Sequence, residues 1–196
     1  MVRAMNPIGS AGLHRRRFLR SFGVAALGLA AARTALADGT ASGERRSLSL
    51  VHTHTFERLT AVYYEAGAYR SAVLGQFNEL LRDFRTETMF PIDPMVLDRL
   101  FLLQSEVGGS EPFQVICGYR SPDTNAALRR ASDGVAEHSL HMQGRALDVR
   151  LPGLATAQLA ALARRQASGG VGYYRVSDFV HLDTGRVRIW GDPVEV

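Results

Sequence analysis

Two imidazoles and one carboxylate stand at spacings that could hold a metal ion. His141 and Asp148 are seven residues apart in the stretch that begins at Ser139, and Gly144 between them allows the backbone to turn back with a positive φ. His181 lies in a short apolar run near the C-terminus that favours a buried strand. Two His and one Asp leave one position of a tetrahedral zinc ion free, which is typical of a catalytic site. We therefore expect His141, Asp148 and His181 to bind zinc.

The ordered form Ser-x-His-x-x-Gly-x-Ala-x-Asp, followed by a strand-borne His, resembles the zinc D-alanyl-D-alanine peptidases that cut bacterial peptidoglycan. The likeness extends to segments 117–122, 170–174 and 179–185, and it is closest to the murein endopeptidases of the YcbK type, which are exported by the twin-arginine pathway. It implies an α+β, Hedgehog-like fold, in which a small antiparallel sheet has helices packed on one face. It also implies a zinc cofactor and hydrolysis of peptide cross-links in the cell wall.

The resemblance implies catalytic roles for further residues. It places Arg120, at the end of a predicted strand, beside the zinc, where it would handle a substrate carboxylate or the developing oxyanion; the alternative is a surface Arg that leads into a helix. Asp178, three residues before His181, takes the position of the proton-shuttling carboxylate, although many relatives carry Glu there and Trp where this chain has Val180. Asp183 should share the strand face of His181, and it could act as the base or orient that ligand.

The charge distribution argues against a nucleic-acid partner. Six of the 23 basic residues lie in the first 37 positions, where there is no acid, and the remaining 17 are balanced by 19 acidic residues. The single cysteine, Cys117, lies in the apolar run 113–117, and we expect it to be a buried small side chain rather than a reactive thiol.

Residues 1–37 have the features of a twin-arginine signal peptide. Arg15, Arg16 and Arg17 precede Phe and Leu, the run 22–32 is apolar but short for a membrane span, and a small-x-small cleavage site ends at Ala37. An amphipathic helix that stays on the membrane surface is the alternative. The predicted partners are therefore the export machinery and then peptidoglycan peptide stems, the membrane is contacted only transiently through the signal, and the location is the periplasm.

Periodicity predicts the elements that position these residues. Residues 38–46 should form a flexible lead-in, and 47–196 a single zinc peptidase domain. Helices are expected over 71–85, 94–107, 123–130 and 156–168, and the second should begin at an Asp93 cap followed by Pro94. Strands are expected over 47–56, 113–119 and 146–150, and a strand pair or loop over 57–69. Segments 172–174, 179–183 and 186–190 should form a terminal antiparallel sheet.

Two other functions fit the same residues. The first is a carboxypeptidase or dipeptidase that trims terminal D-alanine, for which a loop closing the site would be needed. The second is a zinc-bearing module that binds the cell wall without cleaving it. A peptidase of either kind requires a general base, whereas a binding module does not, so this group distinguishes the two classes.

Overall fold

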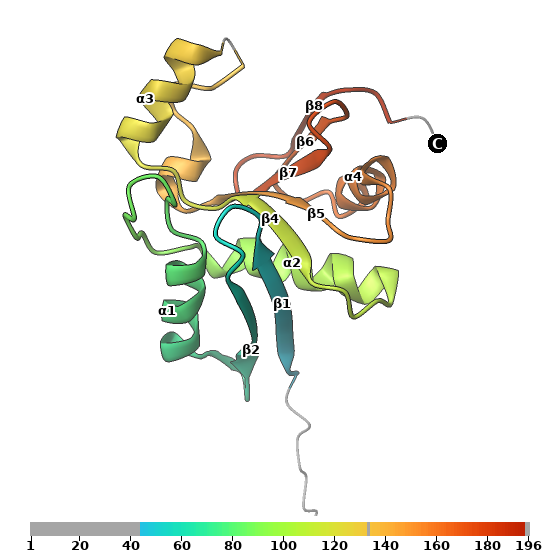
Figure 1. Ribbon diagram of the computed structural model, residues 1–196. Coiled ribbons are helices and arrows are strands. Elements are labelled where there is room, and N and C mark those ends of the chain that lie inside the picture. The colour runs from blue at the N-terminus through green and yellow to red at the C-terminus, as the bar shows by residue number, and fades with distance from the viewer. Residues whose placement is uncertain (1–43, 133, 195–196) are drawn as a thin grey trace, which may run out of the picture. The chain divides into compact units, whose positions relative to one another are not determined.

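The computed structural model describes residues 44–132 and 134–194, and Figure 1 shows the elements in chain order. The predicted signal peptide, residues 1–37, and most of the predicted lead-in lie outside the described residues. No helix among the described residues is long and apolar enough to cross a membrane. The strands are β1 (Arg46–His52), β2 (Arg58–Glu65), β3 (Ala68–Tyr69), β4 (Phe113–Cys117), β5 (Ala146–Arg150), β6 (Gly170–Tyr174), β7 (Phe179–Asp183) and β8 (Arg188–Gly191). The helices are α1 (Ser71–Leu80), α2 (Pro94–Val107), α3 (Pro122–Ala131), the short 3₁₀ helix η1 (Leu140–Gln143) and α4 (Thr156–Arg165).

The eight strands of the described residues form one open sheet in the order β3-β2-β1-β4-β5-β7-β6-β8. The α+β class predicted from the sequence is confirmed. The sheet is larger than expected and is not wholly antiparallel, because β1 pairs in parallel with β4 and β6 pairs in parallel with β8. The predicted terminal antiparallel sheet is therefore part of the single sheet, and its last strand runs parallel to β6.

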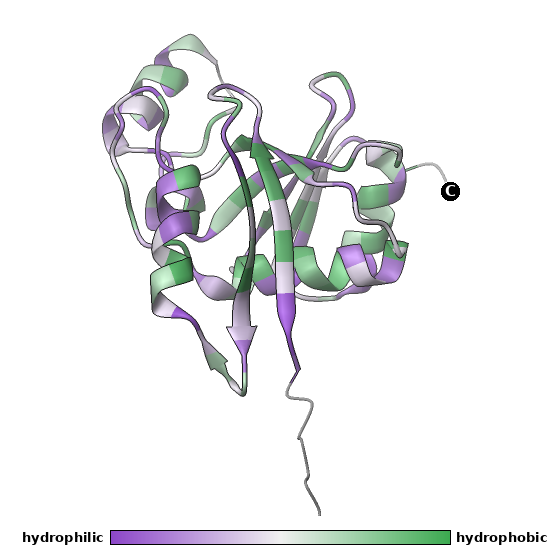
Figure 2. Cartoon of the chain, turned by 60° about the horizontal axis from the view of Figure 1, so that its bottom comes forward, coloured by the Kyte–Doolittle hydropathy of each residue, from purple (hydrophilic) through white to green (hydrophobic). Residues whose placement is uncertain are grey.

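Strand alternation divides the sheet into an apolar face and a polar face. In β5 and β7, Leu147 and Val149 pair with Leu182 and Val180, and all four side chains are fully buried. These residues join one core cluster with apolar residues of α1, α2 and α4, so these three helices cover the apolar face, whereas the described residues of α3 contribute nothing to that core (Figures 1 and 2). Because side chains alternate along a strand, the residues between these core positions project from the opposite face.

Capping residues predict the boundaries of α2 correctly, but the local sequence does not predict where α1 ends. The side chain of Asp93 accepts a hydrogen bond from the backbone of Met95, and α2 ends at Gly108 with φ +73°, as the cap and glycine signals predict. Helix α1, in contrast, ends at Leu80 rather than near residue 85. The carbonyl of Leu81 instead accepts a hydrogen bond from the backbone N–H of Tyr119 (2.7 Å), so a contact between distant segments redirects the chain.

The loop between α1 and α2 supports the segment that carries the predicted zinc ligands. The ring of Phe90 stacks on that of Tyr119, with centroids 5.0 Å apart. Gly144 has φ +64°, and a side chain there would overlap the carbonyl oxygen of Pro91.

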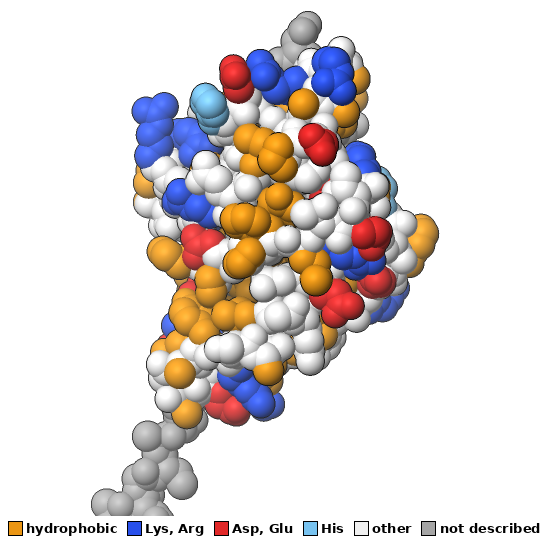
Figure 3. Space-filling model, turned by 90° about the vertical axis from the view of Figure 1, so that its left-hand side faces the viewer, with side chains coloured by type: hydrophobic (Ala, Val, Ile, Leu, Met, Phe, Trp, Pro, Cys, Tyr) orange, Lys and Arg blue, Asp and Glu red, His pale blue; other side chains and the backbone are white. Residues whose placement is uncertain are grey.

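Figure 3 shows the face of the molecule on the side of α1 and α3, where hydrophobic side chains gather between charged groups. Within the loop, Met89 and Phe90 are exposed.

Candidate metal centre and substrate pocket

The three predicted zinc ligands meet on the polar face of the sheet. Asp148 in β5 and His181 in β7 are directly paired across the two strands. His141 comes from η1, whose first turn is capped by Ser139 and which ends at Gly144. Two strands and a capped helical turn therefore bring the three side chains together from positions up to 40 residues apart.

The ligand atoms of these residues form a tight triangle. Nε2 of His141 lies 3.1 Å from Nδ1 of His181 and 3.3 Å from Oδ1 of Asp148, and the distance from His181 Nδ1 to that oxygen is 2.9 Å. Ligand atoms bonded at about 2.0 Å to a tetrahedral zinc ion are about 3.3 Å from one another. All three side chains are buried, and their donor set of two imidazoles and one carboxylate fits zinc. The residues present therefore fit the metal that the sequence predicted.

The outer nitrogen of each imidazole has a hydrogen-bond acceptor that fixes the ring. Nδ1 of His141 lies 2.8 Å from the carbonyl oxygen of Gly118, and Nε2 of His181 lies 3.0 Å from Oδ2 of Asp183. When these outer nitrogens carry the proton, the inner nitrogens of His141 and His181 present their lone pairs to the centre of the triangle. Such outer contacts orient metal ligands and increase their basicity.

Both carboxylate oxygens of Asp183 accept hydrogen bonds. Its side chain is fully buried, and one carboxylate oxygen accepts backbone hydrogen bonds from Gly170 (2.9 Å) and Gly185 (2.8 Å). The other oxygen accepts from Arg188 (2.6 Å) and from His181. Burial would raise the pKa of Asp183, but these hydrogen bonds hold it well below its usual range. Asp183 thus contacts His181 on the shared strand face that the sequence predicted.

The charges within the triangle favour a proton on His141. Burial of His141 opposes protonation, but the adjacent carboxylate of Asp148 outweighs it and raises the pKa of His141 to about 10. Burial of Asp148 would raise its pKa, but the interaction with His141 holds that pKa well below its usual range. A cation at the centre would therefore replace a proton.

Arg120, three residues after β4, lies beside the triangle, where the resemblance placed it. Its Nη2 atom is 3.8 Å from Oδ2 of Asp148 and 3.5 Å from the sulfur of Cys117, and its Nη1 atom donates to Asn125 at 3.4 Å. The Nε atom is buried, and no described residue accepts a hydrogen bond from it. The guanidinium therefore keeps donor capacity for a ligand in the neighbouring pocket.

Asp178 does not join the triangle. Its carboxylate accepts hydrogen bonds from Thr156 (2.9 Å) and Arg150 (3.2 Å), and it lines a separate depression with these two residues. The physical reason is the backbone at the start of the strand. Asp178 precedes β7 and has φ +53°, so the alternation of an extended strand does not set its direction, whereas Asp183, two residues after His181 within β7, lies on the face of His181.

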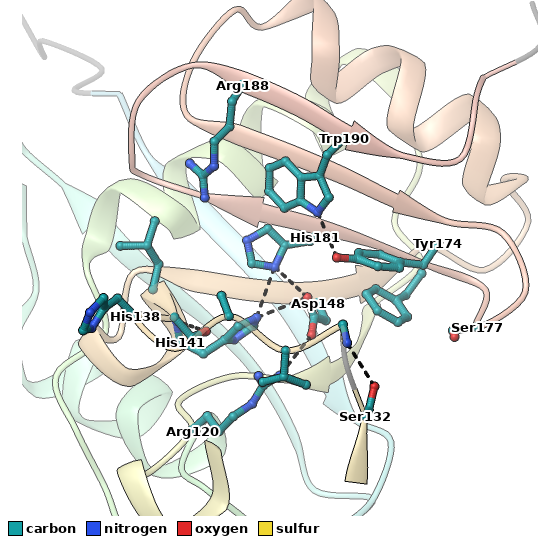
Figure 4. Close-up of a pocket in the computed structure, with 16 residues that line it drawn as sticks. Arg120, Ser132, His138, His141, Asp148, Tyr174, Ser177, His181, Arg188 and Trp190 are labelled. Carbon is teal, nitrogen blue, oxygen red and sulfur yellow. Dashed lines mark hydrogen bonds and ion pairs between the residues drawn. The ribbon is translucent and has the colours of Figure 1, made fainter. Parts of the chain in front are cut away.

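A cavity of about 450 Å³ opens over the triangle. Figure 4 shows Arg120 on one side of it and the aromatic side chains of Tyr174 and Trp190 on the other. Neither aromatic residue received a role from its type and spacing alone. The pairing of β6 with β8 places Trp190 opposite Gly172, and this long-range pairing has no local signal in the sequence.

Cys117 lies closer to the site than the sequence indicated. It is buried, as predicted, but its sulfur is within 4.8 Å of ligand atoms of His141 and Asp148. The ladder between β4 and β5 shifts register between Val115 and Cys117, so that Cys117 pairs with Asp148. A β-bulge of this kind turns a side chain to the other face. Nδ1 of His181 lies 3.1 Å from Nε2 of His141 and 2.9 Å from Oδ1 of Asp148, so His181 remains the predicted third ligand.

Comparisons with known proteins find relatives of this chain. Residues 40–190 match the family model of peptidase family M15_2, which is described as peptidoglycan L,D-endopeptidase MepK. Peptidoglycan L,D-endopeptidase MepK of Escherichia coli is 39% identical over 175 residues, which cover 89% of this chain and 96% of that protein. The probable peptidoglycan L,D-endopeptidase MepK of Haemophilus influenzae is 36% identical over 178 residues, with 90% and 95% covered. This chain therefore belongs to the M15_2 family of peptidases.

Proposed function

We propose that this protein is a zinc-dependent endopeptidase that hydrolyses peptide cross-links of peptidoglycan, at a bond between an L-centre and a D-centre. The observation that carries the proposal is the triangle of ligand atoms from His141, Asp148 and His181 at the floor of an open pocket. The relatives in Escherichia coli and Haemophilus influenzae, a peptidoglycan L,D-endopeptidase and a probable one, support peptidoglycan as the substrate and the L,D bond as the target.

Each residue near the pocket has a distinct task in this proposal. His141, Asp148 and His181 would hold the zinc ion, which when bound supplies a Lewis acid and lowers the pKa of a water molecule to about 7. Arg120 would bind a stem-peptide carboxylate or the oxygen of the scissile carbonyl, because it lines the pocket and its Nη atoms make only long contacts, of 3.4 to 3.8 Å. Asp183 would keep the His181 ring in its ligating orientation.

The two acids near His181 differ in what they can do. Asp183 cannot take a proton from water without giving up buried hydrogen bonds, and the pKa of its carboxyl is well below its usual range. Asp178 faces Arg150 and Thr156. We therefore assign Asp183 to orientation, and we assign Asp178 no proton transfer in the conformation of this structure.

The test is digestion of purified cross-linked muropeptides by the protein without residues 1–37, with and without a chelator, followed by mass spectrometry. Conversion of dimers to monomers that the chelator abolishes supports the endopeptidase, and the masses of the products identify an L,D or a D,D bond. Release of terminal alanine without cleavage of dimers would instead identify a carboxypeptidase. Zinc binding without any product would identify a cell-wall-binding module.

We further propose that residues 1–37 direct the protein through the twin-arginine pathway to the periplasm. The support is the sequence pattern at Arg15 and Arg16 and the cell-wall substrate named for the relatives. Replacing both residues by Lys should retain the protein in the cytoplasm of a cell that exports the unchanged chain. Equal amounts of both proteins in the periplasmic fraction would contradict this export route.

A further inference from the structure

The aromatic wall of the pocket contains a hydroxyl group with a proton to donate. The indole Nε1–H of Trp190 donates a hydrogen bond to the hydroxyl oxygen of Tyr174 at 2.8 Å. An indole N–H can only donate, so the tyrosine oxygen is the acceptor, and its own O–H proton must point elsewhere. Among the described residues, this bond from Trp190 is the one hydrogen bond that the hydroxyl makes.

The hydroxyl is held in position from both sides. The ring of Tyr174 stacks on that of Phe179, its cross-strand partner, with centroids 4.6 Å apart. Trp190 packs closely over Gly172, where an added Cβ would meet the indole at 2.6 Å. The guanidinium of Arg188 lies over the same indole, 4.7 Å from its centroid. Because strands and stacked rings fix both partners, little conformational entropy remains to be lost when a ligand binds.

The hydroxyl faces the space above the triangle. Trp190 lies 5.1 Å from His181 between ring centroids, and both Trp190 and Tyr174 line the pocket that contains Arg120. Figure 4 shows the Tyr174 hydroxyl directed toward the middle of this pocket, with Arg120 on the opposite side. A peptide bound over the triangle would therefore have a cationic donor on one side and a neutral donor on the other.

We propose that Tyr174 donates a hydrogen bond to the carbonyl oxygen of the scissile peptide bond, and that Trp190 orients the tyrosine hydroxyl for this task. The role rests on the proposed peptidase function. When water adds to the carbonyl carbon, negative charge develops on that oxygen, and a preorganised donor stabilises it more than it stabilises the substrate. Tyr174 keeps its proton throughout, so the hydrogen bond requires no additional acid or base.

The test compares Tyr174→Phe with Tyr173→Phe in the zinc-loaded protein. Both changes remove one hydroxyl, but Tyr173 is buried on the apolar face of β6. Removing one oxyanion donor lowers kcat about 10²- to 10³-fold in known cases, and we expect a loss of about that size for Tyr174→Phe, with KM and zinc content close to those of the unchanged protein. Tyr173→Phe should retain kcat. A loss of less than threefold for Tyr174→Phe, or a loss of bound zinc, would overturn the proposal.

A binding measurement separates this proposal from the proposed function. A phosphinate analogue of the scissile bond carries the tetrahedral oxyanion, and Tyr174→Phe should weaken its binding by about the factor lost in kcat, while binding of the product peptide stays unchanged. Equal affinities of the two proteins for the phosphinate would overturn the role of Tyr174. If the unchanged protein cleaves no muropeptide, the proposed function fails, and the difference in phosphinate affinity still tests the hydroxyl.

Discussion

Replacing Asp183 by Asn should weaken both zinc binding and the fold. The two carboxylate oxygens accept hydrogen bonds from two backbone N–H groups, from Arg188 and from His181. In either orientation, the amide that replaces this carboxylate would turn an NH₂ group toward donors that the carboxylate now satisfies. At least one buried donor then loses its acceptor, and Arg188 loses its charge partner.

The size of the effect follows from the burial of these groups. A hydrogen bond to a charged group contributes about 1.5–3 kcal/mol, and breaking a buried charge pair costs about 3–5 kcal/mol. Asp183 is fully buried while Arg188 is about one-third exposed and can turn toward water, so we expect a loss of about 3 kcal/mol. For a domain of this size, that loss lowers the melting temperature by about 6–12 °C. Loss of the contact to His181 should lower zinc affinity and turnover by about 10- to 100-fold.

Asp178→Asn is the matched comparison, since it removes the same charge close to the same strand. The side chain of Asp178 is 58% exposed and its pair with Arg150 is on the surface, so stability should change by less than about 1 kcal/mol. Zinc affinity, measured by competition with a chromogenic chelator, and turnover of muropeptides should both match the unchanged protein. The reasoning is refuted if Asp178→Asn abolishes turnover with zinc bound while Asp183→Asn leaves zinc affinity unaltered.

Three further predictions concern pH and packing. Zinc affinity should rise about tenfold per pH unit between pH 6 and 8, because the metal must displace the proton of His141, whose pKa is about 10 in the metal-free protein; a pH-independent affinity would contradict this. Burial lowers the pKa of His52 to about 4, so the stability that its neutral ring contributes is present above about pH 6.5 and lost as the pH falls toward 4. His52→Asn offers an oxygen to the same backbone N–H groups but does not titrate. The melting temperature of this variant should therefore fall less between pH 6.5 and 4 than that of the unchanged protein, and an equal fall would contradict the role of His52. Gly172→Ala should displace the indole of Trp190 and cost about 1–3 kcal/mol of stability, whereas Gly75→Ala, with open space around it in α1, should cost nothing in a denaturant titration.

Much of the fold could be predicted because its signals are local. Strand β5 has the predicted bounds, and α2 begins after Asp93 and ends at Gly108 as its capping residues indicate. The positive φ of Gly144 was also predicted, and the structure shows it. Such features depend on backbone geometry and on side chains within a few residues, so the sequence alone carries them.

Other features arise from contacts between distant segments and have no local signal. The early end of α1 depends on the hydrogen bond between Leu81 and Tyr119, and the parallel pairing of β8 with β6 depends on where the last strand returns to the sheet. The bulge near Cys117 turns that thiol toward the zinc-ligand residues, which its apolar sequence context did not indicate.

The sequence by itself predicted which side chains would bind zinc, because residue type and order single out His141, Asp148 and His181 as candidate ligands. Only the tertiary structure decided what surrounds them. The alternation of side chains on β7 directs Asp183 toward His181, whereas Asp178 precedes the strand with a positive φ and bonds to Thr156 instead. The pairing of three strands brings Tyr174 to the same pocket. Ligand identity is a property of single residues, whereas the direction of a supporting side chain depends on strand register and long-range pairing.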